Sequence, residues 1–315
     1  MEQNSHPTNI TILSGGIGPE REVSLKSGNA LDKALSSHFP VELIDLSEAE
    51  IPRGLDPSKT VIFPVIHGTF GEDGSLQSML QEGGFSYAGS DCDASRLCMN
   101  KVKAKRKVMD SGVRVSPDFF FTDPQKLDLS EILKKLGPDL VLKPTDQGSS
   151  VALYVISGKD ELKNILSNLP VGNWMLEKRI FGRELTVGVL GNVALGIVEV
   201  IPNGGVYDYE RKYTKGSTEY KFPAILPLSI EDQIKNQAVD SFNACGCRDF
   251  ARVDFMLCED GHPHFLEINT LPGLTDTSLL PKSASCSGYD FSNLVRELVN
   301  PAISRFSKLN LLPAA

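Results

Sequence analysis

The segment 249–280 constrains the fold most, because it has the pattern of a β-hairpin with one apolar and one polar face. Two runs rich in β-branched and aromatic residues, 251–257 and 264–268, flank the dipeptide Asp260-Gly261. Asp-Gly tolerates positive φ angles and is a strong signal for a two-residue hairpin loop. Residues equidistant from such a loop face each other, so the strand pairing can be counted from the sequence.

Counting outward from this loop pairs Asp254 with Glu267 and Arg252 with Asn269. Side chains alternate along a strand, so these four polar residues share one face. The other face is apolar and is expected to be buried; its members are Val253, Phe255, Leu257, Leu266 and Ile268. The hairpin therefore predicts a core on one side and a polar site on the other.

Asp254 and Glu267 would bring two carboxylates face to face. Directly opposed side chains have Cβ atoms about 5 Å apart, so two carboxylates repel unless a cation or a shared proton lies between them. The neighbouring amide oxygen of Asn269 favours a cation. Three oxygen ligands without His or Cys suit Mg²⁺, completed by water and nucleotide phosphates. An ordinary hairpin with a solvated polar face is the alternative.

The residues after the hairpin predict a turn followed by a helix. Residues 271–275 have turn chemistry, and Thr277 or Ser278 is placed to cap a helix that begins at Leu279. The N–H groups at the start of such a helix attract a carboxylate.

Composition and charge exclude several classes of protein. The chain of 315 residues is 41% hydrophobic and 23% charged, which is ordinary for a globular protein of two or three domains. Its formal charge of −8 disfavours nucleic acid or an anionic membrane as the main partner. The polar start of the chain and the lack of a long apolar run predict a cytoplasmic protein. The six cysteines form no C-x-x-C pair, which favours buried, reduced thiols over disulfides or zinc.

The N-terminal part has the pattern of a parallel α/β unit. A buried strand at 9–13 ends at a glycine turn and leads into a helix that reaches Leu35, and further strands are expected at 41–46 and 60–66. Ligands of such sheets bind at the carboxyl ends of the strands, where His67 follows the last strand. Alone, the glycine pair is a weak signal, and a single histidine in this place is more often structural. A full G-x-G-x-x-G is absent, which argues against a dinucleotide fingerprint.

The middle of the chain places lysines next to a glycine-rich loop. Residues 101–109 predict a short basic helix, whose lysines other than Lys101 are expected on a solvated face. A strand at 139–142 ends at Lys143, and the loop 145–150 leads into a strand at 151–156. Such a loop can bring N–H and hydroxyl donors onto phosphate oxygens, or it can be a flexible hairpin tip.

Further along, strands are expected at 173–177 and 185–190, and a core helix at 291–307. The residues between Pro202 and Pro223 show no regular period. Structureless loops of this length inside compact domains tend to be lids or binding loops.

Seven short motifs occur along the chain in this order: Gly15-Gly16 with Glu20-Arg21-Glu22-Val23-Ser24, His67-Gly68, Gly71-Glu72-Asp73-Gly74, Met99-Asn100-Lys101, Lys143-Pro144 with Gly148-Ser149-Ser150, Arg252-Val253-Asp254, and Glu267-Ile268-Asn269-Thr270-Leu271-Pro272-Gly273. Together they resemble the D-alanine–D-alanine ligase family of the ATP-grasp superfamily, over nearly the whole chain. The resemblance implies ATP-driven joining of two D-alanines, through a D-alanyl phosphate, for bacterial cell-wall peptidoglycan.

The resemblance also implies which residues bind the nucleotide. Lys101 and Lys143 would contact ATP phosphates. Main-chain groups around Glu177, Lys178 and Ile180 would hold the adenine, and Glu184 the ribose. The metal ligands would be Asp254, Glu267 and Asn269, which would hold two Mg²⁺ ions or Mn²⁺ in their place.

For the two amino acids the resemblance implies a second group of residues. Glu20 would take the ammonium of the first D-alanine, with His67 near it, and Ser149 and Tyr213 would form a hydrogen-bonded group with Glu20. Arg252 and the N–H of Gly273 would stabilise the tetrahedral oxyanion, as preorganised donors do in acyl transfer. The carboxylate of the second D-alanine would be held by Lys212, Ser278 and the N–H of Leu279.

The sequence departs from the family pattern at four places. A serine or threonine is usual where Ile17-Gly18-Pro19 stands, so the contacts of this loop to the first substrate are an open question. A histidine is frequent at Thr277, an aspartate at Asn100 and a glycine at Ala152. None of these departures removes a metal ligand, a phosphate lysine or Arg252, so an active enzyme is expected.

The implied architecture is α/β, with α+β character in the C-terminal part, in three ATP-grasp domains. Residues 1–99 would form an open parallel sheet that binds substrate, 100–181 the lid domain, and 182–315 a larger mixed sheet that carries the metals. ATP would lie between the second and third domains, and a homodimer is expected. The alternatives are a ligase with D-lactate or D-serine as second substrate, and a nucleotide-binding regulator without turnover.

Overall fold

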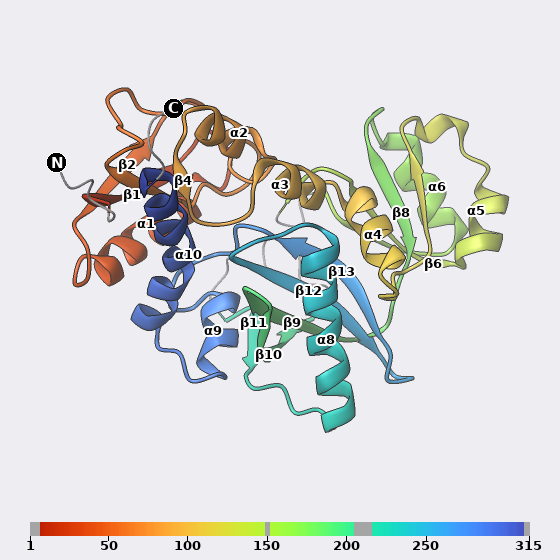
Figure 1. Cartoon of the computed structure of the whole chain (residues 1–315). Coiled ribbons are helices and arrows are strands. Elements are labelled where there is room, and N and C mark those ends of the chain that lie inside the picture. Colours follow the sequence, from red (N-terminus) through yellow and green to blue (C-terminus); the bar gives the residue numbers. More distant parts are fainter. Residues whose placement is uncertain (1–6, 149–151, 205–215, 312–315) are drawn as a thin grey trace.

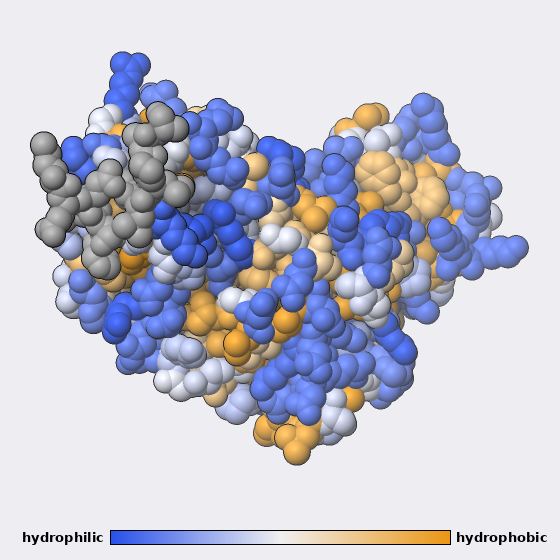
Figure 2. All heavy atoms as spheres, viewed as in Figure 1, coloured by the Kyte–Doolittle hydropathy of each residue, from blue (hydrophilic) through white to orange (hydrophobic). Residues whose placement is uncertain are grey.

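The computed structural model describes residues 7–148, 152–204 and 216–311. Within these residues the strands form three sheets, and helices lie around and between them (Figure 1). The central sheet and its helices form a separate lobe, on the right in Figure 1. The space-filling view shows a notch between this lobe and the rest of the molecule (Figure 2).

The N-terminal sheet is parallel, as the sequence predicted, with the strand order β2-β1-β3-β4. Its strands are β1 (Asn9–Gly15), β2 (Val41–Leu46), β3 (Thr60–Pro64) and β4 (Ser86–Tyr87). Helices α1 (Arg21–Leu35) and α2 (Ser75–Glu82) connect strands of this sheet, and α3 (Cys92–Met99) follows it. Because the strands are parallel, the loops after β1 and β3 lie at one edge of the sheet and bring Glu20 and His67 there.

The central sheet is antiparallel and has the order β5-β8-β6-β7. Its strands are β5 (Asp118–Phe121), β6 (Asp139–Pro144), β7 (Tyr154–Ser157) and β8 (Trp174–Lys178). The basic helix α4 (Lys101–Asp110) precedes it, and η1 (Pro124–Lys126), α5 (Leu129–Leu136) and α6 (Lys159–Asn168) belong to its lobe. Apolar side chains of α5 and α6 form a common core with the sheet.

The third sheet has five strands in the order β11-β10-β9-β12-β13. They are β9 (Gly182–Leu190), β10 (Val193–Pro202), β11 (Thr218–Lys221), β12 (Phe250–Cys258) and β13 (Pro263–Asn269). The expectation of a mixed sheet is wrong, because all four pairings are antiparallel. The short connections β9-β10 and β12-β13 leave room for hairpins but not for the long crossover that parallel neighbours need. Helices α8 (Leu228–Ala244), α9 (Leu279–Ser285) and α10 (Phe291–Leu311) complete this part.

The segment between Pro202 and Pro223 is more regular than predicted. Its residues Thr218–Lys221 form strand β11, which pairs with β10 so that Tyr220 lies beside Val200. The expectation of a loop without structure is wrong for this part. Residues 205–215 lie outside the described ranges.

The hairpin β12-β13 has the predicted partners at its polar face but reaches them in another way. Arg252 pairs with Asn269 and Asp254 with Glu267, as counted from the sequence. Nearer the turn, Leu257 pairs with Pro263, which is one residue out of step with the site pairs. The loop is thus one residue longer than predicted, and an irregularity beside Asp254 offsets it. The two differences cancel, so the register at the site is correct although the predicted loop length is wrong.

Because of the same irregularity, the prediction for one core residue is wrong. Leu266 was expected on the buried face but lines a cavity, whereas Phe265 is 1% exposed and occupies the core. In a β-bulge two residues of one strand oppose a single residue of its partner, so strict alternation fails there. Val253, Phe255, Leu257 and Ile268 are buried as predicted.

The cores join segments that are far apart in the sequence. Leu294, Val295 and Leu298 of α10 lie in one cluster with Ile10 and Ile12 of β1. Ala104 and Val108 of α4 lie in another cluster with the third sheet and α8. The end of the chain therefore covers the first sheet, and the basic helix is anchored to the third.

Candidate active site

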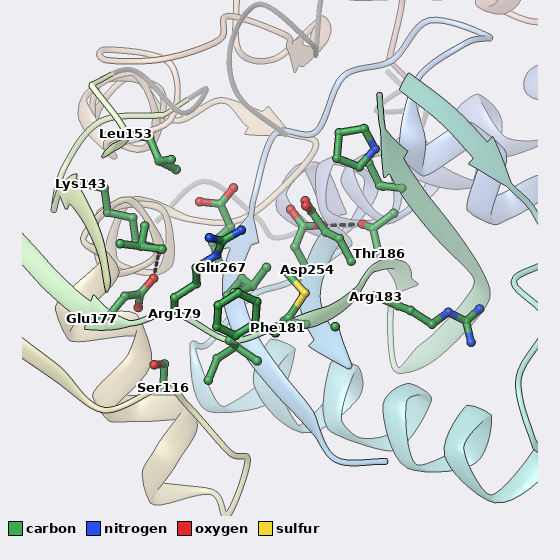
Figure 3. Close-up of a pocket in the computed structure, with 18 of the residues that line it drawn as sticks. Ser116, Lys143, Leu153, Glu177, Arg179, Phe181, Arg183, Thr186, Asp254 and Glu267 are labelled. Atoms are coloured by element: carbon green, nitrogen blue, oxygen red, sulfur yellow. Dashed lines mark hydrogen bonds and ion pairs between the residues drawn. The ribbon is translucent and has the colours of Figure 1, made fainter. Parts of the chain in front are cut away.

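A cavity of about 370 Å³ lies between the central and third sheets. Lys143 and Glu177 form one wall, and Thr186, Asp254 and Glu267 form the other (Figure 3). The other predicted nucleotide residues that line it are Lys101, Lys178, Ile180 and Glu184, together with Leu279. The structure thus gathers all six predicted nucleotide residues and two of the three predicted metal ligands around one space.

Asp254 lies at the centre of a hydrogen-bonded group on the polar face of the hairpin. Arg252 donates from Nε to Oδ1 over 2.9 Å and from Nη2 to Oδ2 over 2.8 Å. Thr186 donates its hydroxyl to Oδ1 over 2.5 Å, and Asn269 donates its amide Nδ2 to Oδ2 over 3.1 Å. These donors hold the Asp254 carboxylate in one orientation toward the cavity.

Glu267 lies across from Asp254 and contacts a different cation. The Lys101 ammonium is 3.4 Å from Glu267 Oε2, and it also donates to the carbonyl of Gln147 over 2.7 Å. Lys101 therefore connects the metal face to the glycine-rich loop. Each of the two opposed carboxylates has a positive neighbour, as their mutual repulsion requires.

The predicted metal ligands fit a hard cation by the chemistry of their donors. Asp254, Glu267 and Asn269 supply carboxylate and amide oxygens from one face of the hairpin, the donor type that Mg²⁺ prefers. Across the described ranges, no cluster of three or more His, Cys, Asp or Glu side chains is arranged to hold a metal ion. The predicted set differs from such a cluster because its third member is an amide.

A buried network of charges forms the opposite wall. Lys143 Nζ lies 2.5 Å from Glu177 Oε1, and Lys105 Nζ lies 2.8 Å from Glu177 Oε2 and 3.0 Å from Asp118 Oδ2. Burial alone would raise the pKa of Glu177, but the charges of Lys143 and Lys105 outweigh it and lower this pKa to about 2. Burial likewise opposes the charge of Lys143, and Glu177 more than offsets it, so the pKa of Lys143 is raised.

The prediction that the other lysines of the basic helix lie on a solvated face is wrong for Lys105. Its side chain is 1% exposed and also donates to the carbonyl of Ser116 over 2.9 Å. The helical spacing of Lys105 from Lys101 puts both on one face of α4, and this spacing was the signal that could have identified it. Thr186 and Asp118 were also missed, and no motif marked them.

The first-substrate residues lie at the edge of the parallel sheet. Glu20 is 8% exposed, and a Cβ built on Gly68 or Gly148 would lie 3.0 or 3.7 Å from its Oε2. His67 is 3.3 Å from the Ser27 hydroxyl through Nε2 and 3.3 Å from Glu72 Oε1 through Nδ1. The structure therefore brings Glu20 beside both His67-Gly68 and the glycine-rich loop. Ser149, Lys212 and Tyr213 lie outside the described residues.

The turn before α9 gathers hydroxyl groups. Ser278 occupies the N-cap position, as one of two predicted candidates, but its hydroxyl makes no capping bond to the helix. The hydroxyl instead accepts from Thr275 N over 3.1 Å and is 2.8 Å from Thr275 Oγ1. A Cβ built on Gly273 would lie 3.0 Å from Ser278 Oγ, so Gly273 and Ser278 are close neighbours.

The structure shows what two of the four departures from the family pattern mean locally. Ala152 has a φ of +52°, in the left-handed region where glycine is favoured. Asn100 caps α4 by accepting from Lys103 N over 3.0 Å, which an aspartate would also do. Ile17 is 62% exposed, and Thr277 lies 3.2 Å from the Thr275 hydroxyl.

Comparisons with known proteins agree with this geometry. The model of the family described as D-ala D-ala ligase C-terminus matches residues 110–300. A D-alanine--D-alanine ligase of Thermotoga maritima is 40% identical over 304 residues, which cover 93% of this chain and 97% of the relative. One from Methylacidiphilum infernorum is 36% identical over 305 residues, covering 95% of this chain and 97% of the relative.

Solved structures are similar over the same length. The crystal structure of D-alanine--D-alanine ligase from Bacillus anthracis complexed with ATP has a TM-score of 0.82 at 29% identity, and covers 95% of this chain and 99% of that one. The VanG D-Ala:D-Ser ligase from Enterococcus faecalis has a TM-score of 0.83 at 28% identity, covering 94% and 99%.

Three sheets with a charged cavity between the second and third define an ATP-binding ligase of the ATP-grasp class. Within that class, the chain belongs to the D-alanine–D-alanine ligase family. Among the helices of the described residues, none is both long and apolar enough to cross a membrane.

Proposed function

We propose that this protein joins two D-alanines to D-alanyl-D-alanine at the expense of ATP. The carboxylate of the first D-alanine attacks the γ-phosphorus of ATP, and ADP leaves. The amine of the second D-alanine then attacks the carbonyl carbon of the D-alanyl phosphate, loses a proton, and phosphate leaves. The observation that carries the proposal is one cavity in which Lys101 and Lys143 face the polar side of the hairpin.

The nucleotide half of the site would work by positioning and charge. Lys101 and Lys143 hold the phosphates, the main chain around Glu177, Lys178 and Ile180 holds the adenine, and Glu184 holds the ribose. Two magnesium ions, or manganese, would be held by Asp254, Glu267 and Asn269 and would neutralise charge on the phosphates when bound. The opposed carboxylates and their cationic neighbours support this assignment.

The amino-acid half would use residues from two sheets. Glu20, with His67 near it, binds the ammonium of the first D-alanine, and Ser149 and Tyr213 complete a hydrogen-bonded group. Arg252 and the N–H of Gly273 stabilise the oxyanion of the tetrahedral intermediate. Lys212, Ser278 and the N–H of Leu279 hold the carboxylate of the second D-alanine. The closeness of Gly273 and Ser278 supports this grouping.

The remaining assignments belong to the same proposal. The domains are 1–99 for the first substrate, 100–181 as the lid and 182–315 for catalysis. The enzyme acts in the cytoplasm as a homodimer and supplies the dipeptide for peptidoglycan.

Product analysis by mass spectrometry tests the proposed reaction. Purified protein with D-alanine, ATP and Mg²⁺ is expected to give one D-alanyl-D-alanine for each ADP and phosphate. L-alanine serves as the control substrate and is expected to give no dipeptide. ATP binding without any ADP release would refute the proposal in favour of a regulator without turnover.

A ligase with another second substrate is the runner-up, and the likeness to a D-Ala:D-Ser ligase favours testing it. In the D-alanine–D-alanine ligase family, a tyrosine at the position of Tyr213 is associated with the dipeptide product, and a phenylalanine with the product made from D-lactate. Tyr213→Phe is therefore expected to keep ATP binding and to gain relative use of D-lactate, most clearly below neutral pH, where the D-alanine amine is protonated. Product partitioning that does not change with pH would contradict this role. Preferred use of D-serine by the wild type would establish the runner-up.

A further inference from the structure

Asp249 lies in the turn before β12 in an unusual backbone conformation. Its φ is +63°, in the left-handed region that residues other than glycine rarely adopt. Its side chain is 3% exposed. A buried carboxylate on a strained backbone persists only where surrounding contacts hold it in place.

Arg305 of α10 supplies a two-pronged contact to this carboxylate. Its Nη1 donates to Oδ1 over 2.7 Å and its Nη2 to Oδ2 over 2.6 Å. The same Nη2 donates to the carbonyl of Tyr87 over 2.7 Å, and Gly89 N donates to Asp249 Oδ2 over 2.9 Å. Asp249 thus ties α10 and the segment after β4 to the start of β12.

Arg248 attaches the same turn to β4 through separate contacts. Its Nε donates to the carbonyl of Gly89 over 2.9 Å, and its guanidinium lies 4.7 Å from the centroid of the Tyr87 ring. Its backbone N–H donates to the Ser90 hydroxyl over 3.3 Å. Two successive residues therefore fix segment 87–90 against the third sheet.

These contacts join the N-terminal sheet, where His67 lies, to strand β12, which carries Arg252. β4 is the edge strand of the N-terminal sheet and pairs with β3, after which His67 follows. β12 begins directly after Asp249 and carries Arg252. α10 lies against α1 and β4 (Figure 1), so Arg305 reaches Asp249 from the element that covers the N-terminal sheet.

We propose that Asp249, held by Arg305, is a positioning residue for the amino-acid half of the reaction. It sets Arg252 of β12 relative to the sheet that carries Glu20 and His67. The inference rests on the proposed function, in which these residues act on the first D-alanine and its tetrahedral intermediate. Misplacement of reacting groups by about 1 Å costs about 100-fold in rate, so a firm joint between the sheets has a direct catalytic effect. Arg248, Asp249 and Arg305 are not among the residues that line the cavity between the central and third sheets.

The test compares Asp249→Asn and Arg305→Lys with the wild type as full-length enzymes. Asparagine tolerates the left-handed conformation and keeps the shape but lacks the charge. Lysine keeps the charge of Arg305 but lacks its fork. In both variants kcat/KM for D-alanine is expected to fall about tenfold or more, while KM for ATP changes by less than about twofold.

Arg96→Met is the matched control, because it removes an ion pair with Asp93 in which the side chains are 57% and 90% exposed. It is expected to leave both constants unchanged. The double variant of Asp249 and Arg305 is expected to lose no more activity than the worse single variant, because the pair acts as a unit.

A purely structural role predicts a lower Tm with unchanged kinetics where the variants are folded. That result, an equal loss of ATP affinity, or additive losses in the double variant would overturn the proposal. If Asp249→Asn fails to fold, the proposal is decided by kcat/KM for D-alanine and KM for ATP measured on Arg305→Lys. Absence of ligase activity in the wild type would refute the proposed function instead, so the two failures are distinguishable.

Discussion

Asp254 and Glu267, the two opposed carboxylates of the site, have different neighbours and differ in how firmly they are held. The two oxygens of Asp254 accept from a guanidinium, a hydroxyl and an amide, so its orientation is fixed before any ligand binds. Glu267, across the strand pair, is 24% exposed and has the Lys101 ammonium as a charged neighbour at 3.4 Å. A bound cation would therefore compete with a lysine at Glu267 and with an arginine at Asp254.

Replacing Glu267 by Gln tests the metal assignment. The variant keeps the shape of the side chain but loses the charge that a hard cation requires. Magnesium-dependent turnover is expected to fall by about two orders of magnitude or more, with an unchanged circular dichroism spectrum. Titration of Mg²⁺ at saturating ATP measures the effect, and Glu259→Gln in the exposed hairpin loop is the control. An unchanged magnesium requirement would remove Glu267 from the metal site.

Glu177 predicts how stability responds to acid. Its folded pKa, about 2, is below the ordinary value of 4.5. The stabilisation is therefore fully present above pH 4.5 and is lost as the pH falls toward 2. At about 1.4 kcal/mol for each pKa unit, the contribution is of the order of 3 kcal/mol.

Urea unfolding of the wild type and of Glu177→Gln at several pH values measures this contribution. The difference in unfolding free energy between the two is expected to be large at pH 6 and to shrink as the pH falls below 4.5. Glu50→Gln, at an exposed position, provides the comparison. A difference that stays constant with pH would mean that Glu177 acts through packing and not through its charge.

At the scale of elements, the hairpin shows what sequence patterns can and cannot predict. Alternation of apolar and polar residues identified both strands, their polar face and the two site pairs. The pattern did not reveal the bulge, because Phe265 and Leu266 are both apolar and either of them could face the core. The longer loop was missed because the bulge offsets it, so that the site pairs agree with a two-residue loop. The helical spacing from Lys101 marked one face of α4 that includes Lys105, but it did not show that this lysine is buried, because its partners Asp118 and Glu177 lie outside the helix.

Because of the bulge, the neighbouring residues Phe265 and Leu266 lie on opposite faces of the hairpin, and replacing each by Ala tests this assignment. Phe265 is 1% exposed and packs edge-on against Phe255, with ring centroids 6.3 Å apart, whereas Leu266 lines the nucleotide cavity. Phe265→Ala is expected to cost about 3–5 kcal/mol of stability. Leu266→Ala is expected to cost about 1 kcal/mol or less and to raise KM for ATP about fivefold. Urea unfolding and ATP kinetics on both variants check this. The reverse pattern would restore the strict alternation that the sequence suggested.

At the scale of the whole molecule, the sequence predicted the parallel first sheet and the ATP-grasp class but not how the parts join. Helix α10 completes the core of the first sheet from the far end of the chain, and α4 shares the core of the third sheet. Helical periodicity shows that such helices have an apolar face, but it does not show which sheet covers that face. The joint at Asp249 was missed for the same reason, because its partners Gly89 and Arg305 are far from it in the sequence.

The position of the cavity predicts how ATP changes the stability of the molecule. Its walls come from two sheets with separate cores, so a nucleotide that touches Lys143 on one wall and Glu184 on the other binds only when both sheets are folded and in contact. A ligand of the folded state at a concentration of about 100 times its Kd stabilises that state by about 2.7 kcal/mol. Domains of 150–250 residues gain about 2–4 °C in Tm for each kcal/mol, so a rise of about 5–10 °C is expected.

Thermal unfolding with a non-hydrolysable ATP analogue and Mg²⁺ measures this rise, with D-alanine alone as the comparison. Lys143→Met is expected to reduce the shift at a fixed analogue concentration, because it weakens binding from the central wall. Exposed Lys163→Met on α6 lies on the same lobe and is expected to leave the shift unchanged. A single transition that moves as a whole would show that ATP couples the two sheets. A shift confined to one of two resolved transitions would mean that the nucleotide contacts only one wall, and would contradict the proposed position of ATP between them.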